Sequence, residues 1–392
     1  MSQQLINLNP DLKQLRDEGY YIEIKDGYLL LHDVPYLNKD KIVLTGTIVS
    51  QLVFAGGNLV KPKDHVAYFI GGPPCDKNGI MLNSLINNTA KKKLTVTLET
   101  DCMFSSKPAG GYKNYYDKMI TYLNIILTHT KSIDPNATAK TFKVIEEKDE
   151  QSIFRYFDTN SSRADILGVS TKLENQKIAI VGLGGTGSYI LDFLTKTPVT
   201  ELHLFDEDKF LNHNAFRSPG APSIEDLEKQ PSKVSYFSGI YIKMRKNIIA
   251  HEYFIDEKNL NELKGFNFVF LCIDNSKSKK EIIEFLHSEN INFIDCGMGL
   301  SLVDDVIIGS LRVTLSSSNK KDHVFERINT CDTDEDEAYQ SNIQIAELNA
   351  LNAALAVIKW KKKCGFYQDI EKEFNIVYSL NVNQLISSDY EA

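Results

Sequence analysis

The sequence predicts an α/β fold, with a Rossmann-like, doubly wound and mostly parallel sheet preceded by a smaller α+β domain. A glycine-rich turn at 182–187 joins a short apolar run to a helical stretch, as in dinucleotide-binding βαβ units. Further apolar runs of the kind found in buried parallel strands follow it. The chain has 392 residues, more than one hydrophobic core usually serves, so two domains are expected.

Residues 1–148 are predicted to form the α+β domain, and the polar connection Glu146–Gln151 leads into the second domain, 152–392. The dipeptide Asp26–Gly27 between two β-type segments predicts a hairpin. Apolar residues at helical spacing predict a helix over Tyr112–His129. A partner- or acceptor-binding role for this domain is a hypothesis from architecture alone. The expected strands are Tyr20–Ile24, Tyr28–Leu31, Ile42–Val49, Val66–Ile70 and Leu94–Leu98.

In the second domain, the apolar strand Ile178–Val181 runs directly into the glycine turn. Glycines at 182, 184 and 187 allow a tight turn and a close approach of the backbone to phosphate. The helix that follows has free N–H groups and a dipole that favour an anion. Many nucleotide-binding folds share this motif, so the residues after it decide the ligand.

The charged residues downstream favour ATP over NAD. Asp206 follows an apolar strand close to the ~20-residue offset at which an acidic side chain meets ribose hydroxyls. A triphosphate carries roughly four negative charges and needs cations, which Arg217 and Lys233 supply. Asp274 follows the apolar strand Phe266–Ile273 and suits Mg²⁺, which takes one or two carboxylates together with phosphate oxygens.

The region from about Phe154 to Tyr367 resembles the ThiF family and the adenylation domains of ubiquitin-activating enzymes. The resemblance rests on the glycine loop, a DxD…N..R run, the lysine of QPSKV and an Asp-Asn pair after a strand. The stretches HNAFRSPGAPS and NIQIAELNALNAALAVIKWKK are similar to a bacterial subgroup with an uncharacterised N-terminal domain. The matching residues are Gly182, Gly184, Gly185, Gly187, Asp206, Asp208, Asn214, Arg217, Lys233, Asp274 and Asn275.

This resemblance implies ATP-dependent adenylation of the C-terminal carboxylate of a ubiquitin-like β-grasp protein, with release of pyrophosphate. It implies that Gly185 lines the nucleotide and that Arg163 reaches ATP from the neighbouring subunit of a homodimer, with Arg155 as the alternative. Arg217 and Lys233 are assigned to the phosphates and Asp274 to Mg²⁺. Asp206 is assigned to the ribose, and Asp208 to a supporting role or a water on the metal. No general base is needed, because the attacking carboxylate is already ionised.

Two residues have open roles. Cys331 precedes the predicted helix Ile343–Lys361, roughly where relatives carry a cysteine that accepts the activated protein as a thioester. Its acidic neighbours disfavour a thiolate, so an incidental loop cysteine is an equally open interpretation. Lys279 occupies a position where relatives often have an arginine, and a surface lysine is as compatible with the sequence.

Composition narrows the function classes. A net charge of −8 and a pI near 5.6 argue against nucleic acid as the main partner. The six cysteines include no CxxC pair, so no zinc is expected. The start of the chain has neither a basic nor an apolar segment, and no apolar run could span a bilayer, so a cytoplasmic protein is expected. The open alternatives are an inactive nucleotide-binding scaffold, adenylation of a small-molecule or RNA carbonyl, and an NAD-dependent oxidoreductase.

Overall fold

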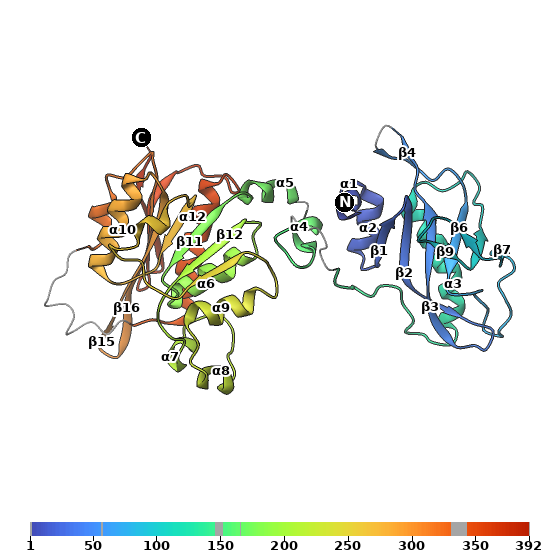
Figure 1. The fold of residues 1–392 in the computed structure, drawn as a ribbon, viewed down its shortest axis with the longest axis horizontal. Helices are drawn as coiled ribbons and strands as arrows, with labels where there is room; N and C mark the ends of the chain where they lie inside the picture. The colour runs from blue at the N-terminus through green and yellow to red at the C-terminus, as the bar shows by residue number, and fades with distance from the viewer. Residues whose placement is uncertain (1, 56–57, 146–151, 165, 331–342, 392) are drawn as a thin grey trace. The chain divides into compact units, whose positions relative to one another are not determined.

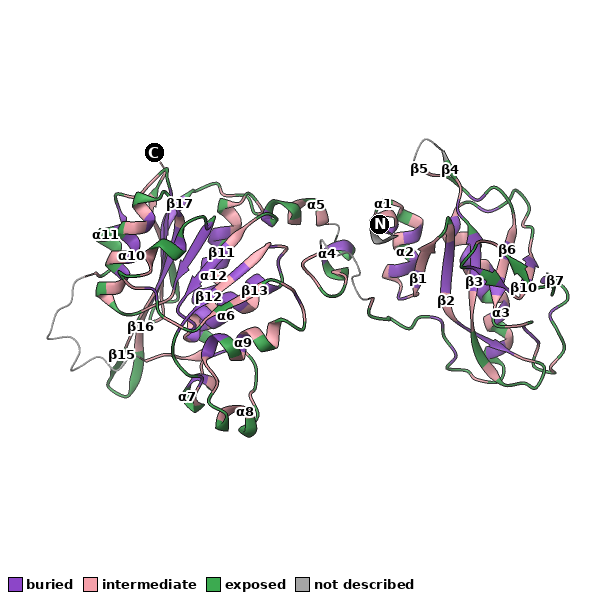
Figure 2. Cartoon of the chain, viewed as in Figure 1, coloured by how far each residue is buried: buried purple, intermediate pink, exposed green. Residues whose placement is uncertain are grey.

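The computed structural model describes residues 2–55, 58–145, 152–164, 166–330 and 343–391. The chain divides into two compact units, residues 1–145 and 146–392, each with its own sheet and core (Figure 1). In each unit the buried residues concentrate in the central strands and the helix faces against them, as Figure 2 shows. Among the described residues no helix is both long and apolar enough to cross a membrane.

The N-terminal unit is built on a six-stranded antiparallel sheet in the order β1-β2-β3-β6-β10-β7. Helix α3 packs against it through Met119, Tyr122 and Ile126, and Asn114 caps the helix by accepting a hydrogen bond from the backbone of Asp117. The elements are α1 Ser2–Leu8, α2 Pro10–Asp17, β1 Ile22–Lys25, β2 Tyr28–Leu37, β3 Val43–Gln51, β4 Phe54–Ala55, β5 Asn58–Leu59, β6 Val66–Ile70, β7 Ile86–Asn88, β8 Lys92–Lys93, β9 Glu99–Thr100, β10 Cys102–Ser105 and α3 Tyr115–Lys131.

The predicted hairpin is confirmed, because Lys25 pairs with Tyr28 around Asp26 and Gly27, both of which have positive φ. The strand predicted over Leu94–Leu98 is wrong. Residues 94–98 form the turn that joins β8 to β9, and the backbone N–H of Leu94 donates to the carbonyl of Leu98. The threonine hydroxyls that produce the alternating pattern donate to the Asp26 carboxylate, so they stabilise a loop rather than a strand.

The C-terminal unit contains an eight-stranded sheet in the order β13-β12-β11-β14-β15-β16-β17-β18. The first five strands are parallel, and the remaining pairs are antiparallel. The chain starts the sheet at β11 and places β12 on one side and β14 on the other, so the strand order reverses at β11. Open α/β sheets bind ligands at the carboxyl ends of the strands beside such a reversal.

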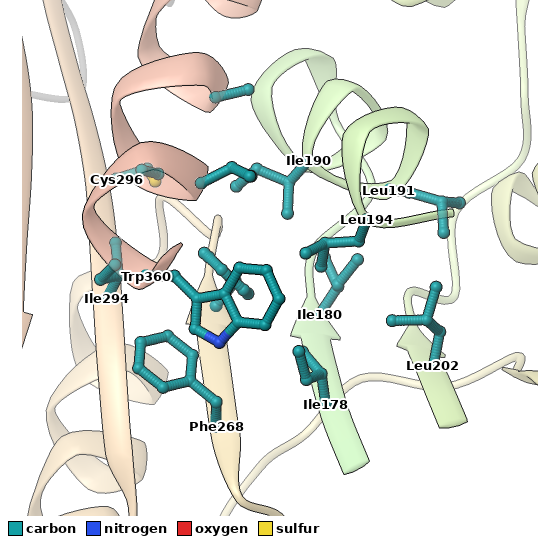
Figure 3. Packing of buried hydrophobic residues seen from close by; sticks show 14 of the residues in the cluster. Ile178, Ile180, Ile190, Leu191, Leu194, Leu202, Phe268, Ile294, Cys296 and Trp360 are labelled. Carbon is teal, nitrogen blue, oxygen red and sulfur yellow. The ribbon is translucent and has the colours of Figure 1, made fainter. Parts of the chain in front are cut away.

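Helices cover both faces of this sheet. Helices α6 and α12 pack on one face, where Ile180, Ile190, Leu194 and Trp360 meet in one cluster (Figure 3). Helix α10 covers the other face through a second cluster. The elements are α4 Thr159–Arg163, α5 Leu167–Ser170, η1 Thr171–Leu173, β11 Lys177–Val181, α6 Gly185–Thr195, β12 Glu201–Phe205, α7 Asn212–Ala215, α8 Ile224–Glu228, α9 Lys233–Tyr241, β13 Ile248–His251, η2 Leu260–Leu263, β14 Phe268–Leu271, α10 Ser276–Ser288, β15 Asn292–Val303, β16 Val306–Ser316, α11 Val324–Arg327, α12 Ala346–Lys363, β17 Glu373–Ser379 and β18 Gln384–Tyr390.

The α/β fold predicted from the sequence is therefore confirmed, with limited differences. Helix α12 begins at Ala346 rather than Ile343, and residues 343–345 are not helical. The apolar runs Ile291–Cys296 and Ile307–Thr314 predict two short strands. In the structure, β15 continues seven residues beyond Cys296 and forms a long hairpin with β16. In the eight-stranded sheet, the sequence did not reveal β13, β17 and β18, which lie at or near the sheet edges, and in the N-terminal sheet it did not reveal β7 and β10.

Candidate functional site

The glycine loop lies at the reversal point, between the end of β11 and the start of α6. Gly182 has a φ of +91°, and a Cβ there would lie 2.6 Å from the carbonyl oxygen of Cys272 on the neighbouring strand connection. A Cβ on Gly187 would lie 1.9 Å from the carbonyl oxygen of Gly182, so the helix can pack this tightly only with glycine. A Cβ on Gly184 would meet nothing within 4 Å. Gly184 therefore borders open space at the N-terminus of α6, the geometry that suits phosphate.

Asp206 braces this loop from the end of β12. Its Oδ2 accepts a hydrogen bond of 2.7 Å from the backbone N–H of Leu183, and its Oδ1 accepts one of 2.9 Å from the backbone N–H of Asp208. The side chain is almost fully buried. Asp206 thus fixes the glycine loop against the next strand, and the ribose contact expected from its position stays a prediction.

Lys233 connects the same region to α9. It is only 6% exposed, and its Nζ lies 2.6 Å from Oδ2 of Asp208 and 3.4 Å from Oδ1 of Asp206. Its backbone N–H donates to the carbonyl of Asp208. One buried cation therefore forms ion pairs with two carboxylates. The Asp208 side chain remains half exposed, so a ligand could also contact it.

Arg217 approaches the glycine loop from the segment 211–218, called here the arginine loop. Its Nε is buried and has no hydrogen-bond partner among the described residues. A buried guanidinium N–H without a partner is costly, and an anionic oxygen is its natural acceptor. Asn214 shapes the loop, since its Oδ1 accepts from the backbone of Leu211 and its carbonyl accepts from the backbone of Arg217. A direct nucleotide contact by the Asn214 side chain stays a prediction.

Asn349 on α12 is a site residue that the sequence did not reveal. Its Nδ2 donates to the carbonyl of Arg217 at 3.2 Å, and its Oδ1 accepts from the hydroxyl of Thr186 at 3.0 Å. The signal that could have found it is an amide in the apolar stripe of a helix, because buried amides need hydrogen-bond partners. Its partners lie more than 130 residues earlier in the chain, so the sequence around Asn349 does not identify them.

Asp274 and Asn275 follow β14 at the same edge of the sheet. Asp274 is exposed, and its contact with Mg²⁺ stays a prediction. Asn275 caps α10, because its Oδ1 accepts a hydrogen bond of 2.9 Å from the backbone N–H of Ser278. The cap role therefore belongs to Asn275, and Asp274 lies just before the helix.

Lys279 is not a surface lysine. It is buried on α10 with its Nζ 3.0 Å from Oδ1 of Asp295, a fully buried carboxylate that also accepts from Arg312 at 2.6 Å. The two cations compensate one buried charge, which is the arrangement a buried carboxylate requires. Lys279 thus fixes α10 to β15 and β16 beside the site.

The remaining predicted residues lie apart or outside the described chain. Arg163 ends the short helix α4 and is exposed, so its contact with a second subunit stays a prediction. Cys331 lies outside the described residues. Within the described ranges no group of three or more His, Cys, Asp or Glu side chains is arranged to hold a metal ion. A magnesium ion at Asp274 would therefore take further ligands from phosphate and water, as Mg²⁺ usually does.

Comparison with protein-family models gives two matches. Residues 10–159 match a domain of unknown function, DUF6791, and residues 159–358 match the ThiF family. The second match spans more than half of the 392 residues and contains the glycine loop, Arg217, Lys233, Asp274 and Asn349. The chain belongs to the ThiF family. The resemblance noted from the sequence motifs is thereby confirmed, and the ThiF domain is the part that carries the candidate site.

Two relatives are similar to this chain over part of their length. Ubiquitin-like modifier-activating enzyme 5 of Drosophila mojavensis is 28% identical over 152 residues, which are 36% of this chain and 38% of that protein. The tRNA threonylcarbamoyladenosine dehydratase of Haemophilus influenzae is 27% identical over 128 residues, 32% of this chain and 49% of that protein. The chain therefore spans between about two fifths and half of the length of these relatives.

Solved structures similar to this chain are more distant in sequence. A crystal structure of E. coli MccB with MccA-N7isoASN superposes with a TM-score of 0.47 and 16% identity, covering 60% of this chain and 72% of that one. A crystal structure of E. coli MccB with ATP has a TM-score of 0.45 and 19% identity, covering 57% of this chain and 66% of that one.

Proposed function

We propose that this protein is an ATP-dependent adenylyltransferase that activates the C-terminal carboxylate of a ubiquitin-like β-grasp protein and releases pyrophosphate. One observation carries the proposal. The buried Nε of Arg217 has no acceptor among the described residues, and it belongs to the loop that Asn349 links to the N-terminus of α6. Membership of the ThiF family supports the same reading.

The hydrogen-bond donors at this edge suit a triphosphate better than a dinucleotide. Arg217 supplies a cation whose Nε has no partner among the described residues, and the amides at the start of α6 supply further donors. Lys233 is already paired with Asp206 and Asp208, so it would bind a phosphate only by exchanging one of these contacts for it. NAD has only about two negative charges at its pyrophosphate, which helix amides can largely satisfy. An unpartnered arginine N–H therefore favours ATP, and it argues against the oxidoreductase alternative.

The proposed reaction joins two anions. A carboxylate oxygen of the partner protein attacks the α-phosphorus of ATP, the bond from that phosphorus to the bridging oxygen breaks, and pyrophosphate leaves with the electron pair. Arg217 and Lys233 neutralise the phosphates, and the glycine loop holds the α-phosphate in line. No proton is transferred, which agrees with a site built from cations and backbone amides. Asp274 would hold a Mg²⁺ ion, which when bound would supply further neutralisation of the negative charge on the phosphates.

The assembly and the later step are part of the same proposal. Arg163 would reach the nucleotide of a second copy, which makes the active form a homodimer. Thioester transfer to Cys331 would follow adenylation, and the N-terminal unit would bind the partner or the acceptor. Each of these statements rests on the family resemblance and needs its own test.

The proposal is tested by exchange of labelled pyrophosphate into ATP, using the full chain and candidate β-grasp proteins encoded beside it. Partner-dependent exchange in the wild type, lost in Asp274→Ala and kept in the exposed-loop variant Asp322→Ala, is the expected result. ATP binding without exchange for any partner would favour the inactive scaffold. Exchange that depends on a small carboxylic acid or on RNA, and not on a β-grasp protein, would show that the substrate belongs to one of those classes instead. An RNA substrate would agree with the name of one relative, the tRNA threonylcarbamoyladenosine dehydratase.

A further inference from the structure

We propose that Asn349 is a positioning residue that holds the glycine loop and the arginine loop in the arrangement that binds ATP. The inference rests on the proposed function and adds to it a residue on α12, outside the loops that would touch the nucleotide. Asn349 contacts both loops through its side-chain amide, and it is 1% exposed.

The two hydrogen bonds of Asn349 use opposite ends of the amide. The carbonyl of Arg217 can only accept, so Nδ2 must be the donor to it, at 3.2 Å. Oδ1 then accepts from the hydroxyl of Thr186, the second residue of α6, at 3.0 Å. Because the amide is buried, water does not compete for either bond. The side chain therefore fixes the distance between the start of α6 and the backbone that carries the Arg217 guanidinium.

Gly185 shows how tightly this amide is packed. A Cβ on Gly185 would lie 2.0 Å from Nδ2, 2.4 Å from Cγ and 2.7 Å from Oδ1 of Asn349, and no other atom is nearer. A Cβ on the adjacent Gly184 would meet nothing. The glycine at 185 thus makes room for Asn349, whereas the glycine at 184 borders the open space assigned to phosphate. Because Asn349 fills the space beside Gly185, Gly185 can contact the nucleotide only through its backbone atoms.

Asn352 provides a matched control on the same helix. It is fully buried, and its Nδ2 donates to the carbonyl of Gly297 at 3.0 Å. It has the same amide, burial and kind of acceptor as Asn349, but it contacts β15 instead of the two loops, and its Oδ1 has no partner among the described residues. A role in stability alone predicts the same behaviour for both residues.

The experiment titrates the full chain with MgATP by calorimetry and records thermal unfolding for each variant. Asn349→Ala and Asn352→Ala are both expected to lower the unfolding temperature. Only Asn349→Ala is expected to weaken ATP binding, by about tenfold, because two hydrogen bonds that order the loops are lost. The affinity of Asn352→Ala is expected to stay within twofold of wild type. Equal losses of affinity in the two variants would overturn the positioning role.

A double-mutant cycle with Arg217→Ala gives the sharper measurement. If Asn349 acts by placing Arg217, removal of Arg217 is expected to cost at least fivefold less affinity in the Asn349→Ala background than in the wild type. Additive losses would contradict the inference. Gly185→Ala provides a second cycle, since Asn349→Ala removes all three atoms that the new methyl group would strike. The double variant is expected to recover the unfolding temperature lost in Gly185→Ala but not the ATP affinity.

The outcomes separate this inference from the proposed function. A wild-type chain that does not bind MgATP overturns the proposed function and the inference with it. Binding by the wild type with unchanged affinity in Asn349→Ala overturns the inference alone. If Asn349→Ala does not fold, Asn349→Asp keeps the shape and the Thr186 bond but loses the donor to Arg217. Its expected result is again about tenfold weaker binding, and wild-type affinity in this variant would refute the role.

Discussion

The N-terminal unit pairs its buried tyrosine hydroxyls with its own backbone, whereas the ThiF domain leaves a buried arginine N–H without a partner among the described residues. The Tyr115 hydroxyl donates to the carbonyl of Gln51 and accepts from the backbone of Val53. In the ThiF domain, Nε of Arg217 is one of several buried polar atoms without a hydrogen-bond partner among the described residues, and it belongs to the arginine loop. A buried polar group satisfied within the protein stabilises the fold, while an unpartnered donor beside the glycine loop is a natural contact for an anionic ligand.

The same contrast holds for one buried lysine in each unit. Lys118 is buried on α3, and burial lowers its pKa, but its partner Asp64 lies 3.5 Å away and is half exposed. Lys233 is buried between two carboxylates, one of them almost fully buried. Lys118 can therefore be lost without stranding a charge, and Lys233 cannot. The predictions below test this difference, from the largest expected effect to the smallest.

Replacing Arg217 with alanine is expected to have the largest effect. Exchange of pyrophosphate into ATP should fall by about 100-fold or more, because a preorganised donor to the developing charge is lost. The free energy of unfolding should change by less than about 1 kcal/mol, since Nε has no partner to lose among the residues that the structure describes. Pyrophosphate exchange measures the activity, and urea unfolding measures the free energy of unfolding. If Arg217→Ala lost stability but kept exchange, Arg217 would have a structural role and not a role in binding ATP.

Replacing each buried lysine with methionine compares the two units directly. Lys233→Met should abolish exchange and destabilise the protein by about 3 kcal/mol, because Asp206 is left buried without its cation. Lys118→Met should be neutral or slightly stabilising, since Asp64 can be solvated. Urea unfolding of both variants checks this, and a large loss of stability in Lys118→Met would show that the lysines are equivalent.

Two glycines of the loop should separate stability from binding. Gly187→Ala is expected to cost about 1–3 kcal/mol of stability, because the methyl group would strike the carbonyl of Gly182. Gly184→Ala should leave stability within about 0.5 kcal/mol of wild type and weaken ATP binding, since its methyl group enters open space beside the start of α6. Thermal unfolding and ATP titration test the pair. Equal unfolding temperatures in the two variants would contradict the geometry of the loop.

Acid should loosen the ThiF domain at its β12 and β13 edge. Burial lowers the pKa of His203 and of His251, whose rings share a hydrogen bond of 2.9 Å. Below the ordinary histidine pKa of about 6.5 the unfolded chain then binds more protons than the folded one, so stability falls as the pH falls. The loss is at most about 1.4 kcal/mol per pH unit for each histidine. Hydrogen-exchange protection at pH 7 and pH 5.5 measures it, and greater protection of β12 at pH 5.5 would refute it.

The smallest effect is expected for the thiols of the N-terminal unit. Burial raises the pKa of Cys102 to about 11, and it also raises the pKa of Cys75. At pH 8 only about one Cys102 in a thousand would be a thiolate, so alkylation of the folded protein should be slow. Cys102→Ala should keep exchange within twofold of wild type. Rapid labelling of Cys102, or loss of exchange in this variant, would give the N-terminal unit a thiol chemistry that its geometry does not support.

Sequence patterns located most of the elements that form the candidate site. The strand before Gly182, the strand before Asp206 and the strand before Asp274 were each predicted from short apolar runs. The alternating pattern of Leu94–Leu98 predicted a strand wrongly, because the carboxylate of Asp26, in the turn between β1 and β2, accepts hydrogen bonds from Thr95 and Thr97 and holds them in a turn. It also missed β13, β17 and β18, because strands near a sheet edge lack a continuous apolar run.

The sequence by itself determined the three strands that lead into the site, the glycine turn and the charged residues placed just after these strands. These depend on neighbours within a few residues, where backbone sterics and apolar periodicity act. Only the tertiary structure decided that Lys279 is buried with Asp295 and Arg312, and that Asn349 joins the loops that carry Thr186 and Arg217. Such contacts join residues far apart in the chain, and their partners are chosen by the packing of whole helices on the sheet rather than by local sequence.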